Sequence, residues 1–169
     1  MCEMNKTTGI AIIGYGGMGS WHVKTIARIP ELELRGVYDI SQERMDLAVE
    51  RGIPTYESME ALLADESVSI VTVAIPNQLH KDVCIRALQA GKNVVCEKPV
   101  ALDHTELQAM IAAAKENNVL FTVHQNRRWD EDYLTVKKII EEGNLGQIFR
   151  LESRVHGAHG IPGDWRQYP

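Results

Sequence analysis

The stretch of sequence that decides the fold is Gly9-Ile10-Ala11-Ile12-Ile13-Gly14-Tyr15-Gly16-Gly17-Met18-Gly19, in which an apolar run leads into glycines spaced as GxGxxG. In this spacing Gly14 permits a tight turn from strand to helix, Gly16 lets backbone N–H groups approach a phosphate, and Gly19 lets the helix pack closely on the sheet. The N-terminus of a helix that begins here adds a partial positive charge at the same place. The pattern therefore predicts a turn that binds a nucleotide phosphate, through the residues Gly14, Tyr15, Gly16, Gly17, Met18 and Gly19.

Beyond this unit, the chain alternates between short apolar runs and longer stretches with helical spacing. The expected strands are residues 9–13, 32–38, 70–75, 93–96 and 120–123, and the expected helices are residues 18–29, 42–51, 59–63, 79–90, 104–117 and 131–142. The run 70–75 is almost continuously apolar, which is typical of a parallel strand buried on both faces. The pattern predicts the α/β class, with a doubly wound parallel sheet covered by helices on both sides.

Cap residues indicate where some of these helices begin and end. Asp103 stands at an N-cap position, and Glu106 follows it by three residues, as in a capping box. Three glycines stand just after expected helix ends, where a left-handed backbone is favoured. They are Gly52, Gly91 and Gly143.

A carboxylate stands where a dinucleotide would need one. Asp39 closes the second expected strand, twenty residues after Gly19. There a carboxylate accepts hydrogen bonds from the hydroxyls of an adenosine ribose, and we expect Ile40 beside it to contact the same ligand. An isolated Asp at a strand end can equally be a solvated turn or a helix cap, but the strand, the glycines and Asp39 together favour dinucleotide binding.

Asp39 also bears on the choice between two dinucleotides. A carboxylate on the ribose repels a 2′-phosphate, so NAD is favoured over NADP. Arg44 in the following helix offers an alternative, because it could reach a phosphate; it could equally be a solvated surface charge.

Two further segments follow expected strands. Pro76-Asn77-Gln78-Leu79-His80 comes after the run 70–75, and Glu97-Lys98-Pro99 comes after the run 93–96. In an open parallel sheet, ligands bind outside the carboxyl ends of the strands, so both segments belong on the same edge as the glycine turn. Taken singly, Pro76-Asn77 could be a turn with a helix cap, and His80 could be a histidine whose hydrogen bonds are satisfied at a helix start. Glu97-Lys98 could be a surface charge pair.

At these residues the sequence resembles the glucose-fructose oxidoreductase and inositol 2-dehydrogenase family, written Gfo/Idh/MocA. Its members carry a GxGxxG after a strand, a Pro-Asn-x-x-His segment and a Gly-Lys-x-Val-x-x-Glu-Lys-Pro stretch. Here these are Gly14 to Gly19, Pro76 to His80 and Gly91 to Pro99. The runs 124–130 and 164–166 are similar to parts of the family's second domain, so the resemblance extends over essentially the whole chain.

The resemblance implies a two-domain dehydrogenase. Residues 1–125 would be a Rossmann domain that binds NAD(P), through Pro76, Asn77, His80 and Glu97 among others. Residues 126–169 would be the incomplete start of a second α/β domain, which binds a sugar, polyol or similar small molecule and commonly forms a homo-oligomer interface. Asn126 and Arg128 would lie near the nicotinamide, whereas Trp129 could simply be core.

By the same resemblance, Glu97 would hydrogen-bond the nicotinamide ribose and Lys98 would be the catalytic residue. Moving a hydride from an alcohol carbon requires loss of the hydroxyl proton, and a lysine at that place can share in this transfer or polarise the carbonyl in the reverse direction. A cis Lys98-Pro99 bond is possible at this turn.

Relatives in the family are about twice as long, so we expect a truncated chain whose usual catalytic histidine would follow residue 169. His156 and His159 do not match the family's motif and are interpreted as loop histidines. Residues 147–155 are expected to be the first strand of the second domain's sheet. Such a strand, without its sheet, should be mobile or should pair with another chain.

Composition excludes several other classes. The chain has 169 residues, 44% hydrophobic and 24% charged, with a formal charge of −5, and neither sign forms a block that would follow nucleic acid or an anionic membrane. No apolar run approaches the roughly 20 residues of a membrane span, and the amino end lacks a signal peptide, so we expect a cytoplasmic protein. Cys2, Cys84 and Cys96 have no metal-ligand spacing and are interpreted as reduced thiols, and no metal is expected.

The sequence thus predicts an NAD(P)-dependent oxidoreductase that transfers a hydride between nicotinamide and a sugar-like or polyol-like substrate. One alternative is a sensor or regulator of the same fold that binds a dinucleotide without catalysis. A methyltransferase with a glycine-rich loop is disfavoured by Asp39 and by Glu97-Lys98-Pro99.

Overall fold

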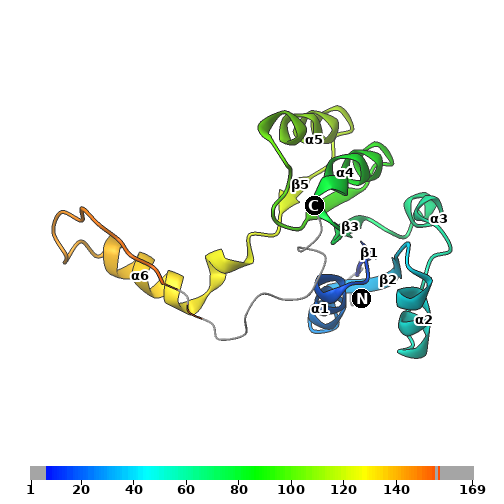
Figure 1. Cartoon of the computed structure of the whole chain (residues 1–169), viewed down its shortest axis with the longest axis horizontal. Coiled ribbons are helices and arrows are strands. Elements are labelled where there is room, and N and C mark those ends of the chain that lie inside the picture. The colour runs from blue at the N-terminus through cyan, green and yellow to red at the C-terminus, as the bar shows by residue number, and fades with distance from the viewer. Residues whose placement is uncertain (1–6, 155, 157–169) are drawn as a thin grey trace, which may run out of the picture. The chain divides into compact units, whose positions relative to one another are not determined.

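The computed structural model describes residues 7–154 and 156, which divide after His124 into two compact units (Figure 1). The first unit contains a sheet of five parallel strands in the order β2-β1-β3-β4-β5. The strands are β1 (Thr8–Ile13), β2 (Leu32–Tyr38), β3 (Ile70–Val73), β4 (Asn93–Cys96) and β5 (Phe121–Val123). The predicted doubly wound parallel sheet is confirmed.

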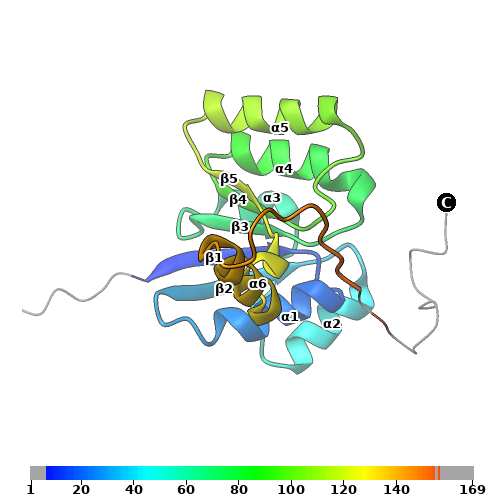
Figure 2. The same cartoon turned by 90° about the vertical axis from the view of Figure 1, so that its left-hand side faces the viewer.

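Helices connect the strands and cover both faces of the sheet. They are α1 (Gly17–Ile26), α2 (Gln42–Glu50), α3 (Met59–Ala64), the 3₁₀ turn η1 (Asn77–Leu79), α4 (His80–Gln89) and α5 (His104–Glu116). Figure 2 shows α4 and α5 on one side of the strands and α1 and α2 on the other. The fold is therefore a three-layer Rossmann-like sandwich.

The period of two in β1 produces this layering. Ala11 and Ile13 point to the core shared with α3, α4 and α5, whereas Ile10 and Ile12 point to the core shared with α1 and α2. All four side chains are nearly inaccessible to solvent. A strand that is apolar on both faces is thus buried between two helical layers, as the sequence pattern indicates.

Most helix ends lie where the cap residues predict them. The Asp103 carboxylate accepts the Glu106 N–H at 2.9 Å, and the Glu106 carboxylate accepts the Leu102 N–H at 3.1 Å. The three predicted end glycines have positive φ, at Gly52, Gly91 and Gly143. These local signals are strong because they satisfy backbone groups that the helix itself leaves without partners.

Strand order brings the functional segments together. The chain leaves β1 toward β2 on one side and returns to β3 on the other, so the sheet changes direction between β1 and β3. The carboxyl ends of all five strands form one edge, which we call the rim, and ligands in such sheets bind there. The loops after β1, β2, β3 and β4 all reach the rim.

The second unit begins at Gln125. Its described elements are the 3₁₀ turn η2 (Asn126–Trp129) and helix α6 (Glu131–Glu141). On α6, Val136, Ile139 and Ile140 share one face at helical spacing, and each is about 40% exposed.

The strand expected at residues 147–155 is not formed, and this prediction is wrong for its described part. Residues 148–154 belong to neither a helix nor a strand. A strand needs a neighbour for its N–H and C=O groups, and the described residues of this unit contain no strand to pair with it. His159 and the run 164–166 lie outside the described residues.

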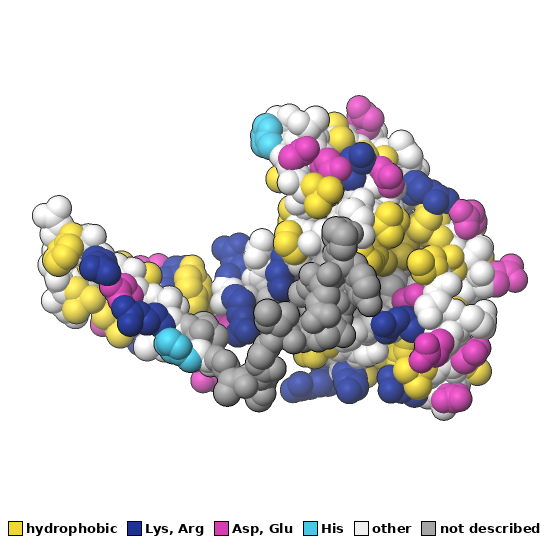
Figure 3. All heavy atoms as spheres, viewed as in Figure 1, with side chains coloured by type: hydrophobic (Ala, Val, Ile, Leu, Met, Phe, Trp, Pro, Cys, Tyr) yellow, Lys and Arg dark blue, Asp and Glu magenta, His cyan; other side chains and the backbone are white. Residues whose placement is uncertain are grey.

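Three observations concern membrane spans, surface charge and the cysteines. No helix among the described residues is long and apolar enough to cross a membrane. On the face shown in Figure 3, basic and acidic side chains are interspersed over the surface. The described cysteines, Cys84 and Cys96, are free and buried.

Candidate cofactor site and catalytic lysine

The glycine turn between β1 and α1 combines close packing with an open surface. Gly14 has a φ of 97°, and a Cβ on it would come within 2.3 Å of the Ala74 carbonyl oxygen. A Cβ on Gly19 would come within 1.9 Å of the Gly14 carbonyl oxygen. Gly17, in contrast, has no neighbouring atom within 4 Å of such a Cβ.

The first N–H groups of α1 face this open surface without a side-chain cap. Gly16 is the N-cap and has no side chain, and the first turn contains no acidic residue. The leading N–H groups of a helix have no partner within the helix, so they favour an anion at this end. The turn can accept a phosphate group, as the sequence predicts, because its two packed glycines hold the backbone while Gly17 leaves room.

Asp39 connects the glycine turn to the end of β2. One of its carboxylate oxygens accepts the Tyr15 N–H at 2.7 Å, and the other accepts the Ser41 N–H at 2.9 Å. Each oxygen retains a lone pair for a further donor. The carboxylate is therefore fixed next to the turn and can accept hydrogen bonds from ribose hydroxyls.

Three residues close to Asp39 or to the glycine turn differ in their exposure and in their contacts. Ile40 is 87% exposed, so an apolar side chain stands free beside the carboxylate. Arg44 is exposed, and its guanidinium also donates to the Tyr15 carbonyl at 3.3 Å. The Tyr15 side chain is buried and its hydroxyl accepts from Arg51, so only the backbone of Tyr15 faces the turn.

In the segment after β3, Pro76 and Asn77 lie at the rim, whereas the His80 side chain is buried. Pro76 precedes η1, and Asn77 opens it with a partly exposed side chain. The His80 ring is fully buried, and its two nitrogens lie 2.9 Å from the carbonyl oxygens of Ile75 and Pro99. His80 therefore holds the loops after β3 and β4 together and has no ring nitrogen left for a ligand.

The environment of His80 favours its charged form. Burial lowers the pKa of His80, but the neighbouring Cys96 sulfur and the hydrogen bonds to the two carbonyls outweigh it and leave the pKa above its ordinary value. A neutral imidazole has only one N–H, whereas two carbonyl acceptors require two. The imidazolium is thus the form that satisfies both loops.

The loop after β4 places a buried carboxylate next to an exposed amine. Glu97 is only 5% exposed, whereas Lys98 is exposed at the rim. The Lys98-Pro99 peptide bond is cis. The two neighbouring side chains therefore lie in different environments, since Glu97 is buried and Lys98 is exposed to solvent.

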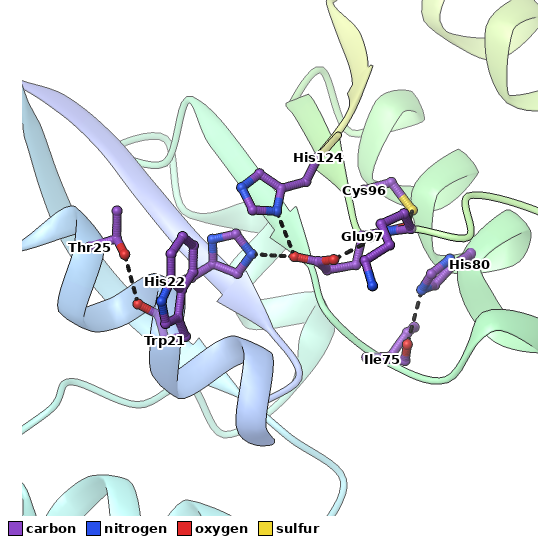
Figure 4. A network of polar contacts seen from close by, with 9 residues as sticks. Trp21, His22, Thr25, Ile75, His80, Cys96, Glu97 and His124 are labelled. Atoms are coloured by element: carbon purple, nitrogen blue, oxygen red, sulfur yellow. Dashed lines mark hydrogen bonds and ion pairs between the residues drawn. The ribbon is translucent and has the colours of Figure 1, made fainter. Parts of the chain in front are cut away.

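Glu97 is held by two histidines from different elements (Figure 4). Its Oε1 lies 2.8 Å from His22 Nε2, on α1, and 2.8 Å from His124 Nδ1, directly after β5. Its Oε2 accepts the Lys98 N–H at 3.2 Å. We call His22, Glu97 and His124 the Glu97 cluster.

The cluster keeps Glu97 ionised although it is buried. Burial raises the pKa of Glu97, but the hydrogen bond from His22 and the charge of His124 outweigh this effect and leave the pKa below its ordinary value. The rings of the two histidines lie 4.7 Å apart in an edge arrangement, and Trp21 packs against both. The rim therefore contains a fixed negative charge beside Lys98.

The family is decided by comparison with known proteins. Residues 8–125 match the Gfo/Idh/MocA family, described as an oxidoreductase family with an NAD-binding Rossmann fold. The chain belongs to this family. The match includes every rim segment described above.

Individual Gfo/Idh/MocA relatives agree with this assignment. The chain is 37% identical to the scyllo-inositol 2-dehydrogenase (NADP(+)) of Bacillus subtilis, over 84% of this chain and 40% of the relative. It is 31% identical to an inositol 2-dehydrogenase of Salmonella paratyphi B, over 92% of this chain and 48% of the relative. The crystal structure of an NAD-binding protein from Listeria innocua has 52% identity and a TM-score of 0.91, over 96% of this chain and 48% of that chain. The chain thus spans less than half the length of these Gfo/Idh/MocA relatives.

Two predicted contacts fall in the second unit. Asn126 and Arg128 belong to η2, and the Arg128 guanidinium lies 5.9 Å from the centre of the Trp129 ring. This contact makes Trp129 a partner of Arg128. Trp129 is 72% exposed, so it does not belong to a core. Asn126 and Arg128 stay predictions as cofactor contacts.

His22 and His124 were missed by the sequence analysis. They are separated from Glu97 by 75 and 27 residues, so spacing along the chain does not connect them. One signal was available for His124, because it directly follows an expected strand and therefore had to reach the rim. For His22 the signal was weaker: it lies three residues after Gly19 on the first turns of the helix.

Proposed function

We propose that this chain is the cofactor-binding part of an NAD(P)-dependent dehydrogenase that acts on CH–OH groups. The observation that carries the proposal is that the glycine turn, Asp39, Glu97 and Lys98 follow three strands of one parallel sheet, β1, β2 and β4, and meet at its rim. Each offers a different chemistry: phosphate binding, ribose recognition, a buried acceptor and an exposed amine. Along the rim their order is Asp39, the glycine turn, and then Glu97 with Lys98, which matches the order of adenosine ribose, pyrophosphate and nicotinamide ribose in a dinucleotide.

The adenosine half of the cofactor would be held near the first two strands. The open surface at Gly16 and Gly17 would receive the pyrophosphate, and Asp39 would accept the ribose hydroxyls. Ile40 offers an apolar surface for the adenine. Asp39 favours NAD over NADP, although the guanidinium of Arg44 close to the turn could partly offset the carboxylate's repulsion of a 2′-phosphate.

The nicotinamide half would lie toward the loops after β3 and β4, near Pro76, Asn77 and Glu97. When bound, the nicotinamide supplies the acceptor or donor of the hydride. Lys98 would hold or release the proton of the substrate hydroxyl at its Nζ, and His80 and Pro99 would fix the turn that presents it. Glu97 would accept a ribose hydroxyl through the remaining lone pair of Oε2.

The names of two relatives support one class of substrate. Both are named as inositol dehydrogenases, which supports a polyol or sugar-like substrate. We expect residues 126–169 to be the start of the substrate-binding domain, in which Asn126 and Arg128 approach the nicotinamide. Homo-oligomer formation would involve the same domain.

Calorimetric titration of the 169-residue chain with NADH, and separately with NADPH, tests the cofactor assignment. The proposal predicts saturable binding of both with tighter binding of NADH. A Gly16→Val variant, whose side chain occupies the open surface of the turn, should bind neither. Binding of neither dinucleotide by the unaltered chain would contradict the proposed function.

A further inference from the structure

We propose that His22 and His124 are positioning residues, which orient the Glu97 carboxylate so that one of its lone pairs faces the bound cofactor. This proposal rests on the function proposed above and assigns roles to two residues outside the motif that contains Glu97. Neither histidine is placed in direct contact with the cofactor. Both act through Glu97.

In the Glu97 cluster, the two oxygens of the Glu97 carboxylate have different hydrogen-bond partners. Oε1 accepts both histidines at 2.8 Å, which uses both of its lone pairs. Oε2 accepts only the Lys98 N–H, at 3.2 Å, and keeps one lone pair. The carboxylate plane is thereby fixed by three donors, and the single remaining acceptor site belongs to Oε2.

Hydrogen bonding describes these contacts better than metal ligation. The three ligand atoms lie within 4.8 Å of one another and could in principle surround an ion. However, both nitrogens lie 2.8 Å from the same oxygen, an ordinary hydrogen-bond length, whereas two ligand atoms at about 2.1 Å from a tetrahedral zinc ion would lie about 3.4 Å apart. The cluster is therefore explained by N–H donors alone.

The Glu97 cluster joins side chains from three different parts of the fold. His22 is carried by α1, Glu97 follows β4 and His124 follows β5, so the carboxylate joins the helix of the glycine turn to the far strands. His22 and Glu97 are buried, whereas the His124 side chain is 22% exposed. A carboxylate held in this way loses little conformational freedom when it binds a ligand.

The proposal makes a tautomer prediction that does not depend on any cofactor. Each neutral histidine must donate with the nitrogen that faces Oε1, so His22 must carry its proton on Nε2 and His124 on Nδ1. ¹⁵N NMR of histidine-labelled chain, recorded at a pH where the ring nitrogen signals show the neutral form of both residues, should show these opposite tautomers. The same tautomer at both residues, or rapid averaging, would overturn the proposal.

A set of variants tests the effect on cofactor binding. His124→Ala removes the donor, whereas His124→Asn places an amide N–H at the position of Nδ1. We expect His124→Ala to weaken NADH binding about tenfold and His124→Asn to restore most of it, since one hydrogen bond to a charged group is lost and regained. His22→Leu and His22→Gln form a second pair, because the Gln amide replaces Nε2. His104→Ala, an exposed histidine at the start of α5, is the matched control and should bind NADH as the unaltered chain does.

The outcomes separate the two proposals. Equal NADH affinity of His124→Ala and His124→Asn, with thermal unfolding midpoints near that of the unaltered chain, would overturn the positioning role. If the unaltered chain does not bind NADH, the proposed function fails, and the tautomers still decide whether the cluster orients Glu97.

Discussion

At the scale of single residues, Asp39 shows how one side chain can serve the fold and the ligand together. Its two oxygens hold the backbone of Tyr15 and Ser41, so the carboxylate cannot turn away from the glycine turn. We expect a fixed negative charge at this place to discriminate between a ribose with a free 2′-hydroxyl and one with a 2′-phosphate. Cofactor preference is therefore a testable property of this residue.

Asp39→Asn should reduce the preference for NADH over NADPH. The amide keeps an acceptor for one of the two backbone N–H groups but removes the charge that repels a 2′-phosphate, so we expect NADPH affinity to rise while NADH affinity falls several-fold. Parallel titrations with both dinucleotides measure the ratio. Asp46→Asn, an exposed carboxylate of α2, is the control, and an unchanged ratio in Asp39→Asn would remove Asp39 from cofactor selection.

Lys98→Ala separates binding from chemistry. Lys98 is exposed at the rim, so its loss should leave thermal stability and NADH affinity near those of the unaltered protein. In a protein that includes the substrate domain, hydride transfer should fall by about 10²- to 10⁴-fold, the usual contribution of a general acid or base. Lys81→Ala, a lysine on α4, serves as control, and a hydride-transfer rate in Lys98→Ala equal to that of the unaltered enzyme would contradict the catalytic assignment.

At the scale of elements, the β1-turn-α1 unit explains which glycines are needed for packing and which for the ligand. Gly19→Ala places a Cβ 1.9 Å from the Gly14 carbonyl, whereas Gly17→Ala meets nothing within 4 Å. We expect Gly19→Ala to lower the free energy of unfolding by about 2 kcal/mol, since backbone must move to accommodate it. Gly17→Ala should leave stability unchanged or slightly higher, because alanine favours helix. Urea unfolding of both variants measures the difference, and equal stability of the two would contradict the packing described here.

Because of a hydrogen bond between Tyr56 and Asp65, the free energy of unfolding should depend on pH in the acid range. The Tyr56 hydroxyl donates to Asp65 at 2.6 Å, and this bond, with those from Ser67, lowers the pKa of Asp65 from 3.8 to about 2. A carboxyl whose pKa is lower in the folded state contributes stability above about pH 4 and loses it as the pH falls toward 2. Tyr56→Phe should therefore lose less stability than the unaltered chain between pH 5 and pH 2.

Urea unfolding at several pH values in this range tests the acid dependence. Glu66→Gln, which alters an exposed neighbouring carboxylate, should keep the acid dependence of the unaltered chain. An unaltered slope in Tyr56→Phe would show that Asp65 owes its low pKa to other partners.

Local signals predicted the elements well, and the reasons for the exceptions are physical. Strands 32–38 and 93–96 and the starts of all six expected helices are placed correctly to within one residue because apolar periodicity and caps are properties of adjacent residues. The expected strand 70–75 is longer than β3, which ends at Val73. Ala74 and Ile75 belong to the following loop, where the His80 ring lies at hydrogen-bonding distance from the Ile75 carbonyl oxygen. The Glu97 cluster could not be predicted, because it depends on which strands become neighbours.

At the scale of the whole molecule, the division after His124 separates a body with its own two cores from a second unit built on α6. Every described contact of the Glu97 cluster and of the glycine turn lies within residues 7–124. The cofactor-binding part should therefore be independent of the remainder of the chain.

A fragment of residues 1–125 tests this independence. We expect it to unfold in a single transition with a midpoint within a few degrees of that of the 169-residue chain, because every residue of the two described cores precedes residue 125. Differential scanning calorimetry of both proteins measures the midpoints. A fragment that fails to fold would show that the second unit completes the first.

Mapping the cofactor onto the backbone tests the central claim most directly. ¹H–¹⁵N spectra of the chain titrated with ADP-ribose should shift the amides of residues 14–20 and 39–41, because that ligand has the pyrophosphate and the adenosine. Titration with NADH should shift these amides and also those of Glu97, Lys98 and His124, which only the nicotinamide half would reach. Shifts that lie away from the rim, or the same set of shifts with both ligands, would contradict the account.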